Sequence, residues 1–303
     1  MNGIILVDKP AGPTSAEIVR LVKARLGRRA RVGHLGTLDP FATGVLPILV
    51  GEATKLAPFL QEGAREYAGL IAIGSETDTL DCTGKIIRTA PGPNLDRVDL
   101  AAIAHRFTGT IEQTPPIFSA IKRSGVPLYK LARRGIEVEP PAPRQVHIEC
   151  LDLAREDNSA IRFRVRCSSG MYLRSLARDI GNALYTAAHL SELRRIRSGI
   201  FLAANCRHLD QVLATLDRGE APGFVSMRSA LAALPEVTID PLLEARLRHG
   251  DSRVLDLLST KVADLFKVVS RGELVAIARR TSHRTAAIVR VFETVAEELE
   301  PSI

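Results

Sequence analysis

The chain has 303 residues, of which 46% are hydrophobic and 25% charged, so it can form one large domain and a smaller one, and wholesale disorder is excluded. Lys and Arg outnumber Asp and Glu by 41 to 34, and the resulting charge of +7 favours a polyanionic partner. No apolar run reaches the length of a membrane span, and the first residues lack the order of a signal peptide, so we expect a cytoplasmic protein that does not enter a membrane.

The first predicted elements are a strand and a helix. Residues 3–7 form a short apolar run that is typical of a strand. Thr14 and Glu17 have the spacing of a capping box, in which both side chains bond to backbone N–H groups at the start of a helix. Apolar residues then recur at helical spacing over residues 18–26, and Gly27 is suited to the helix end.

The next segment, residues 33–47, has the sequence GHLGTLDPFATGVLP. Its three glycines and two prolines exclude a regular element and favour a shaped loop, with Asp39 held in an extended backbone by Pro40. The apolar residues 45–50 that follow predict a core strand. The loop has two interpretations that the segment alone leaves open. Asp39 is either a catalytic carboxylate or a turn residue that accepts backbone N–H bonds.

Further along, residues 66–74 predict a strand, residues 100–107 a helix, residues 145–167 a hairpin and residues 172–184 a helix. The second hairpin strand alternates apolar residues with Arg162, Arg164 and Arg166. This basic outer face fits RNA binding, and it fits equally well an exposed strand that is protected from edge pairing.

The mixture of hairpins and helices indicates an α+β fold rather than a doubly wound sheet. Turn-forming residues near 217–223 suggest a domain boundary close to residue 232, which gives domains 1–231 and 232–303. Three strand-like runs follow the boundary, at residues 267–270, 274–278 and 287–292.

Basic residues form three clusters, which suggest contacts with RNA phosphates, although solvated helix faces would explain any one of them. The clusters are Arg25, Arg28, Arg29 and Arg31; Lys122, Arg123, Lys130, Arg133 and Arg134; and Arg194, Arg195 and Arg197. The four cysteines and seven histidines lack the spacing of a metal site, so we expect no metal and reduced, buried cysteines.

Residues 33–47 resemble the signature loop of the TruB family of tRNA pseudouridine synthases. Five other segments resemble motifs of that family in the same order. They are residues 3–15, residues 65–67 with 77–84, residues 114–122 with 129–135, residues 167–181 and residues 189–195. The resemblance therefore spans residues 3 to about 201.

The resemblance implies the pseudouridine-synthase fold, with a mixed and largely antiparallel central sheet and a small C-terminal PUA-like RNA-binding domain. It implies isomerisation of uridine 55 in the T-loop of tRNA, with the base flipped out of the folded RNA and no cofactor. The partner would be the T-arm and elbow of tRNA, gripped by the segment at about 114–143, which resembles the family's insertion. We expect a monomer.

The resemblance also implies the roles of the site residues. Asp39 matches the catalytic aspartate, Arg174 the active-site arginine that pairs with it, and Tyr67 the tyrosine that stacks on the uracil and assists proton removal from C5. A carboxylate can act as a nucleophile or remove a sugar proton, and the sequence leaves both routes open.

Five further residues are carried over as substrate-binding residues, namely Lys9, Pro10, His34, Tyr172 and Leu193. His34 matches the histidine that occupies or braces the space vacated by the base, and Tyr172 and Leu193 match residues lining the uracil site. Four positions depart from the family pattern, namely Phe118, Ser169, Met171 and Ile196. None of them is a proposed catalytic group.

Two other functions stay open. The guide-RNA-dependent branch of the superfamily performs the same chemistry within a ribonucleoprotein, but the compact chain without long basic tails favours the stand-alone form. An RNA chaperone that remodels the tRNA elbow belongs to a different class. The complete set of Asp39, Tyr67 and Arg174 argues against a purely non-catalytic binder.

Overall fold

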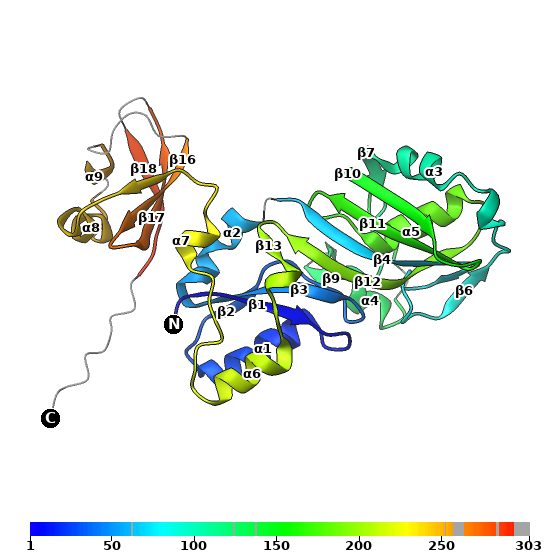
Figure 1. Cartoon of the computed structure of the whole chain (residues 1–303), viewed down its shortest axis with the longest axis horizontal. Coiled ribbons are helices and arrows are strands. Elements are labelled where there is room, and N and C mark those ends of the chain that lie inside the picture. Colours follow the sequence, from blue (N-terminus) through cyan, green and yellow to red (C-terminus); the bar gives the residue numbers. More distant parts are fainter. Residues whose placement is uncertain are drawn as a thin grey trace.

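The computed structural model describes residues 1–61, 63–123, 125–136, 138–251, 253–256, 264–282 and 285–293. In this part of the chain, ten strands form one sheet and four strands form a second, smaller sheet beside it (Figure 1). The spatial order of the large sheet is β14 (Arg207–His208), β1 (Gly3–Lys9), β3 (Thr43–Val50), β12 (Ala188–Ser198), β4 (Arg65–Ile73), β11 (Ala160–Cys167), β10 (Arg144–Arg155) and β7 (Gly109–Gln113), with β2 (Val32–His34) on β3 and β13 (Phe201–Leu202) on β12.

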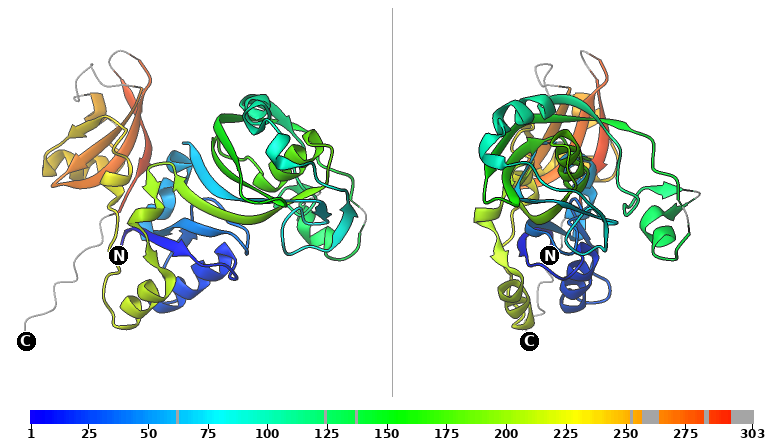
Figure 2. Two further views of the ribbon diagram at one scale, coloured as in Figure 1. Left: turned by 45° about the vertical axis from the view of Figure 1, so that its right-hand side comes forward. Right: turned by 90° about the vertical axis from the view of Figure 1, so that its right-hand side faces the viewer.

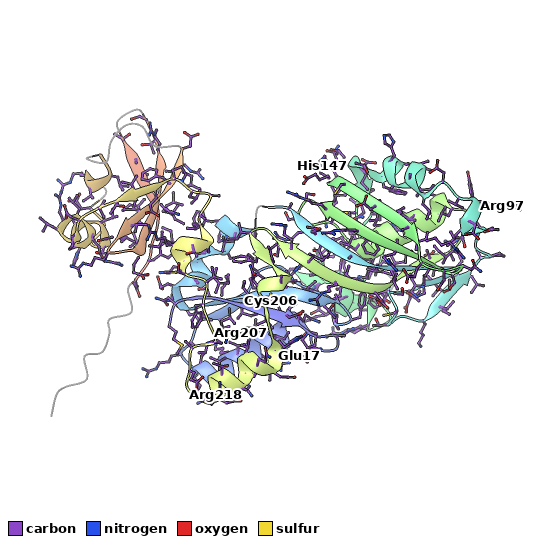
Figure 3. The ribbon with its side chains drawn as sticks, viewed as in Figure 1. Glu17, Arg97, His147, Cys206, Arg207 and Arg218 are labelled. Carbon is purple, nitrogen blue, oxygen red and sulfur yellow. The ribbon has the colours of Figure 1, made fainter. Side chains whose placement is uncertain are left out.

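Helices cover one face of the large sheet. Helices α1 (Ser15–Leu26) and α6 (Leu209–Asp217) pack side by side against the β1 end, and Figure 3 labels Glu17 in the first turn of α1 and Arg218 at the end of α6. Helices α5 (Leu173–Ala183) and α3 (Leu100–Phe107) pack against the half that contains β12 and β10 (Figure 2). Apolar side chains of all four helices join the sheet in one hydrophobic cluster. This cluster is the main core.

A second hydrophobic cluster lies on the opposite face of β1 and β3. It contains residues of the turn η1 (Gly51–Leu56) and of the short helices α2 (Ala57–Leu60) and α7 (Met227–Ala230). It also contains Leu274, Ile277 and Phe292 from the smaller sheet, whose order is β15 (Glu236–Thr238), β16 (Leu265–Ser270), β17 (Glu273–Arg280) and β18 (Ala286–Val291). The smaller sheet is therefore packed onto the large one through apolar side chains. Helices α8 (Pro241–Arg248) and α9 (Arg253–Asp256) accompany it.

The structure confirms the predicted α+β class. Strand pairs β1–β14, β3–β12 and β15–β16 are parallel and the other described pairs are antiparallel, so the large sheet is mixed and largely antiparallel. Helix α1 begins with the predicted capping box and ends at Gly27. The predicted strand at 66–74, the helices at 100–107 and 172–184, and the hairpin all form within two residues of their expected bounds.

The basic outer face of β11 does not guard an edge. Strand β11 lies between β4 and β10, so that explanation was wrong. Its arginines face acidic partners in the pairs Arg162–Glu156, Arg164–Glu66 and Arg166–Glu149. Beside them His147 on β10 points outwards, away from the core (Figure 3). The row is a balanced set of surface ion pairs.

The segment 114–143 contains little regular structure. It holds β8 (Lys122–Arg123), β9 (Val126–Pro127) and α4 (Leu128–Ala132), which stand away from the large sheet (Figure 2). A second small hairpin, β5 (Ser75–Thr77) with β6 (Ile86–Thr89), lies beyond β4. All four cysteines are free, but Cys82 and Cys150 are exposed, so the expectation that every cysteine is buried was wrong.

The contact between the two sheets gives a prediction. Phe292 is fully buried in the shared cluster. Truncating such a phenylalanine to alanine lowers the free energy of unfolding by about 3–5 kcal/mol. Phe292→Ala should therefore lower the melting temperature and expose the C-terminal sheet to limited proteolysis. The control is Val289→Ala on β18, where the side chain is partly exposed and the effect should be small. Equal protease resistance of Phe292→Ala and the wild-type protein would contradict the packing described.

Candidate active site

The loop between β2 and β3 is anchored by its leucines. Leu35 is buried in the second hydrophobic cluster, and Leu38 is buried in the main core. The Ser15 hydroxyl fixes the loop further, because it accepts the N–H of Leu38 at 2.9 Å and donates to its carbonyl at 3.1 Å. The next residue, Asp39, is thereby held on a rigid support beside helix α1.

Asp39 meets Arg174, which lies in the first turn of α5. Arg174 Nη2 donates to Oδ1 of Asp39 at 3.2 Å, and Nε lies 2.9 Å from Oδ2 without hydrogen-bond geometry. The Arg174 side chain is 6% exposed, whereas that of Asp39 is 33% exposed. No described backbone N–H donates to the Asp39 carboxylate. The Asp39 backbone does form a turn, in which its carbonyl accepts the Ala42 N–H at 3.1 Å, while its carboxylate stays partly open to solvent.

The charge state of Asp39 is set by opposing effects. Burial among protein atoms is the largest effect and raises the pKa of the Asp39 carboxyl above its ordinary value. The Arg174 guanidinium acts in the other direction, Asp81 raises the pKa further, and Lys9 lowers it. One third of the side chain remains exposed to solvent. The residue is a carboxylate whose basicity is increased.

Arg174 donates hydrogen bonds to three different segments of the chain. Besides Asp39 it donates to the carbonyl of Thr79 at 3.0 Å and to the carbonyl of Phe118 at 3.1 Å. Thr79 belongs to the loop after β5, and Phe118 belongs to the segment 114–143. The orientation of the arginine therefore depends on both segments. The neighbouring Ser175 hydroxyl also donates to this region, at the Thr114 carbonyl.

Asp81 is a second carboxylate at the site, and the sequence reasoning gave it no role. Its Oδ2 lies 3.7 Å from Nε of Arg174. Its Oδ1 accepts the Thr79 hydroxyl at 2.8 Å, the Thr83 N–H at 2.9 Å and the Thr83 hydroxyl at 2.5 Å. The sequence did contain a signal for Asp81. It lies in the family-like motif at residues 77–84, between Thr79 and Thr83, whose hydroxyl groups can donate to a carboxylate.

Lys9 was predicted to bind substrate, but the structure places its ammonium inside the protein. The residue is 0% exposed, and Nζ donates to the carbonyls of Pro10, Pro40 and Ala42 at 2.9, 2.9 and 2.7 Å. All three donors are therefore used within the protein. Burial lowers the pKa of Lys9 to about 8, with Asp39 opposing this shift and Arg195 adding to it. Lys9 therefore holds the backbone of the Asp39 loop from inside the protein.

Tyr67 lies on β4, directly opposite Arg195 of β12. Its side chain is half-buried, and burial raises the pKa of the phenol while the Arg195 charge opposes the rise. Leu193, two residues before Arg195, is buried in the main core. Tyr67 and Leu193 thus lie on neighbouring strands in the middle of the large sheet.

The other three predicted residues lie on segments that adjoin those already described. His34 on β2 is half-buried, its Nδ1 has no partner among the described residues, and burial lowers its pKa. Tyr172 precedes α5; its backbone exchanges two hydrogen bonds with the Gln113 amide, and the Arg144 guanidinium stacks 4.7 Å from its ring centre. Pro10 is exposed at the end of β1.

Among the described residues, no group of His, Cys, Asp and Glu could hold a metal ion, and no helix could span a membrane.

The chain is similar in sequence to known proteins over most of its length. Residues 23–173 match the model of the "TruB family pseudouridylate synthase (N terminal domain)", and residues 174–232 match the "tRNA pseudouridylate synthase B C-terminal domain". A protein of Geotalea uraniireducens named tRNA pseudouridine synthase B is 41% identical over 92% of this chain and 92% of its own length. Its namesake in Gloeobacter violaceus is 43% identical, over 82% of this chain and 86% of its own.

Solved structures show the same fold. The structure titled as an H/ACA RNP bound to a substrate RNA containing 2′-deoxyuridine has a TM-score of 0.70 at 25% identity and covers 96% of this chain and 85% of its own. A Cbf5–Nop10–Gar1 complex gives a TM-score of 0.69 at 27% identity with the same coverage. Fold and sequence together define a pseudouridine synthase. Within that class, the chain belongs to the TruB family.

The opposing effects on Asp39 give a prediction with a defined sign. Arg174→Gln removes a charge that lowers the pKa of Asp39, so the acid limb of the single-turnover rate should move to higher pH. Asp81→Asn removes a charge that raises the same pKa, so the limb should move to lower pH. Rate constants measured across the acid range for both variants check this. Shifts in the same direction would show that the limb belongs to another group.

Proposed function

We propose that this chain isomerises uridine 55 in the T-loop of tRNA to pseudouridine as a stand-alone, monomeric enzyme of the cytoplasm. The observation that carries the proposal is the pair of Asp39 and Arg174. A buried guanidinium holds the carboxylate from one side, and the other side is open to solvent. This arrangement suits a carboxylate that must act on a bound nucleotide. The relatives named tRNA pseudouridine synthase B support tRNA as the substrate.

The reaction breaks the N1–C1′ bond of uridine, turns the base, and joins C5 to C1′; C5 loses its proton to a base and N1 gains one, so no atom is gained or lost overall. Asp39 serves either as the nucleophile or as the group that removes a sugar proton. Both routes need an ionised carboxylate, and the Arg174 charge favours that form against the effect of burial. Tyr67 is the proposed stacking partner of the uracil and the group that assists removal of the C5 proton. Burial raises the pKa of its phenol, and the Arg195 charge opposes that rise.

The target base must leave the folded tRNA elbow before it can reach Asp39, which costs a few kcal/mol of unstacking. His34 is the proposed residue that braces the vacated space, since it lies on β2 at the entry to the Asp39 loop. The segment 114–143 is the proposed grip on the T-arm. Its basic residues Lys122, Lys130, Arg133 and Arg134 are exposed and have no ion pair with a described residue.

The other two basic clusters are less free to bind RNA. Arg195 is buried, Arg194 pairs with Asp8, and Arg197 lies near Glu66. In the first cluster, two of the four arginines are paired, in the contacts Arg25–Asp217 and Arg31–Glu52. The segment 114–143 therefore carries the strongest argument for phosphate contacts.

A guide-RNA-dependent enzyme is the second candidate, because two similar solved structures are described as an H/ACA RNP and as an archaeal box H/ACA sRNP complex. The test is to incubate the purified protein with an unmodified tRNA transcript without guide RNA and to map pseudouridine. The proposal expects modification at position 55 alone, and none in a transcript with cytidine there. A requirement for a guide RNA, or modification elsewhere, would contradict it.

Asp39→Asn tests the catalytic role. The change keeps the size of the side chain and removes its charge, so single-turnover conversion should fall by more than about a thousandfold. The binding of tRNA should stay within a few fold of wild type, because the RNA contacts lie elsewhere. A tRNA-folding chaperone with secondary catalysis would instead keep its biological effect in this variant. Appreciable pseudouridine formation by Asp39→Asn would remove the residue from the mechanism.

The region from residue 232 onward is the proposed PUA-like RNA-binding domain. Its contact with the large sheet is apolar, so deletion would expose a hydrophobic surface, and point variants are the sharper test. Arg279→Glu with Arg290→Glu changes two exposed residues and should raise KM for tRNA with little effect on kcat, the pattern of lost uniform binding. A minimal T-arm stem-loop should show a smaller effect. An unchanged KM for full-length tRNA would argue against RNA contact by these two residues.

A further inference from the structure

Arg195 is a buried cation to which the proposed mechanism gives no task. It is 1% exposed, and no described carboxylate forms an ion pair with it. Burying an unpaired charge costs several kcal/mol unless its donors are satisfied. The neighbouring Arg194 has the ordinary arrangement, with an exposed side chain paired to Asp8. The cost of Arg195 therefore needs a structural or functional reason.

The donors of Arg195 are used by the two ends of the Asp39 loop. Nη2 donates to the Gly36 carbonyl at 3.0 Å and Nη1 to the Thr37 carbonyl at 3.4 Å, just before Asp39. Nε donates to the Val45 carbonyl at 2.8 Å, after the loop has returned in β3. A single planar guanidinium thus bridges the entry and the exit of the loop.

The backbone of Arg195 also joins the loop to Tyr67. Arg195 lies opposite Gly44 of β3 on one side and opposite Tyr67 of β4 on the other. The approach to Gly44 is so close that a Cβ there would lie 2.2 Å from the Arg195 carbonyl oxygen. On the other side, the Arg195 charge opposes the rise that burial causes in the pKa of Tyr67. One residue therefore contacts both the support of the carboxylate and the tyrosine.

We infer that Arg195 is a positioning residue that fixes Tyr67 and the Asp39 loop relative to each other, so that both side chains face the same uracil. The inference rests on the proposed roles of Asp39 and Tyr67. It explains why an arginine is needed, because three donors in a fixed plane can hold carbonyls on both sides of the loop. A lysine has all its donors on one atom and lacks the separate nitrogens with which Arg195 reaches the two sides.

The test uses full-length Arg195→Lys with Arg194→Lys as the matched neighbour. Because Arg195 is buried, Arg195→Lys should leave KM for tRNA within about threefold while kcat falls about a hundredfold, a loss that a misplacement of about 1 Å can cause. Arg194→Lys should keep both constants within about twofold, since exposed ion pairs contribute little. The proposed function is tested by whether the wild-type protein converts tRNA at all. The inference about Arg195 is tested separately, by the ratio of the variant's kcat to that of the wild type.

A double-mutant cycle with Tyr67→Phe separates positioning from general support of the fold. If Arg195 acts by placing Tyr67, adding Arg195→Lys to Tyr67→Phe should slow kcat by less than about tenfold, well below its effect in the wild-type protein. Full additivity, an unchanged kcat in Arg195→Lys, or a rise confined to KM would overturn the inference. So would an Arg195→Lys protein that does not fold, because Arg195 would then be a residue of the core.

Discussion

Two buried cations hold the loop that carries Asp39, and the rest of the site depends on them. Lys9 and Arg195 each donate to three backbone carbonyls, and all but one of these carbonyls belong to residues 36–45. Buried charges are costly unless every donor finds a partner. Carbonyls of the loop that point inward accept two of the three Lys9 donors and one hydrogen bond from each nitrogen of the Arg195 guanidinium. The backbone is thereby fixed from inside, and the Asp39 side chain remains available to face Arg174 and solvent.

The large sheet makes this arrangement possible through one parallel pairing. Strand β12 runs parallel to β3 and antiparallel to β4, so it stands between the Asp39 loop and Tyr67. The close approach at Gly44 leaves no room for a side chain, which gives this glycine a steric reason as well as its φ of +103°. Arg195 is about 150 residues away in sequence from the loop that it holds. The local sequence around either segment therefore does not predict the hydrogen bonds between them.

The sequence predicted those features that neighbouring residues determine. The capping box of α1, the hairpin of β10 and β11, and α5 all follow from local spacing, and the α+β class follows from their mixture. Long-range placement was not predictable in the same way. The alternation in β11 showed which face is basic but could not show that β4 would pair beside it. The motif around Lys9 suggested proximity to the site but not that its ammonium points into the protein. Asp81 was missed because its role depends on Arg174, which is distant in sequence.

Strand β1 connects the site with the smaller sheet. Its period of two sends Ile5 and Val7 into the main core, and Ile4 and Leu6 into the cluster that the smaller sheet completes. The same strand ends at Lys9, which holds the Asp39 loop. Because close-packed interiors resist displacement, the distance between the site and the smaller sheet is fixed by this strand. An RNA that contacts both would meet two surfaces at a set separation, and its folded shape could be recognised without reading most of its bases.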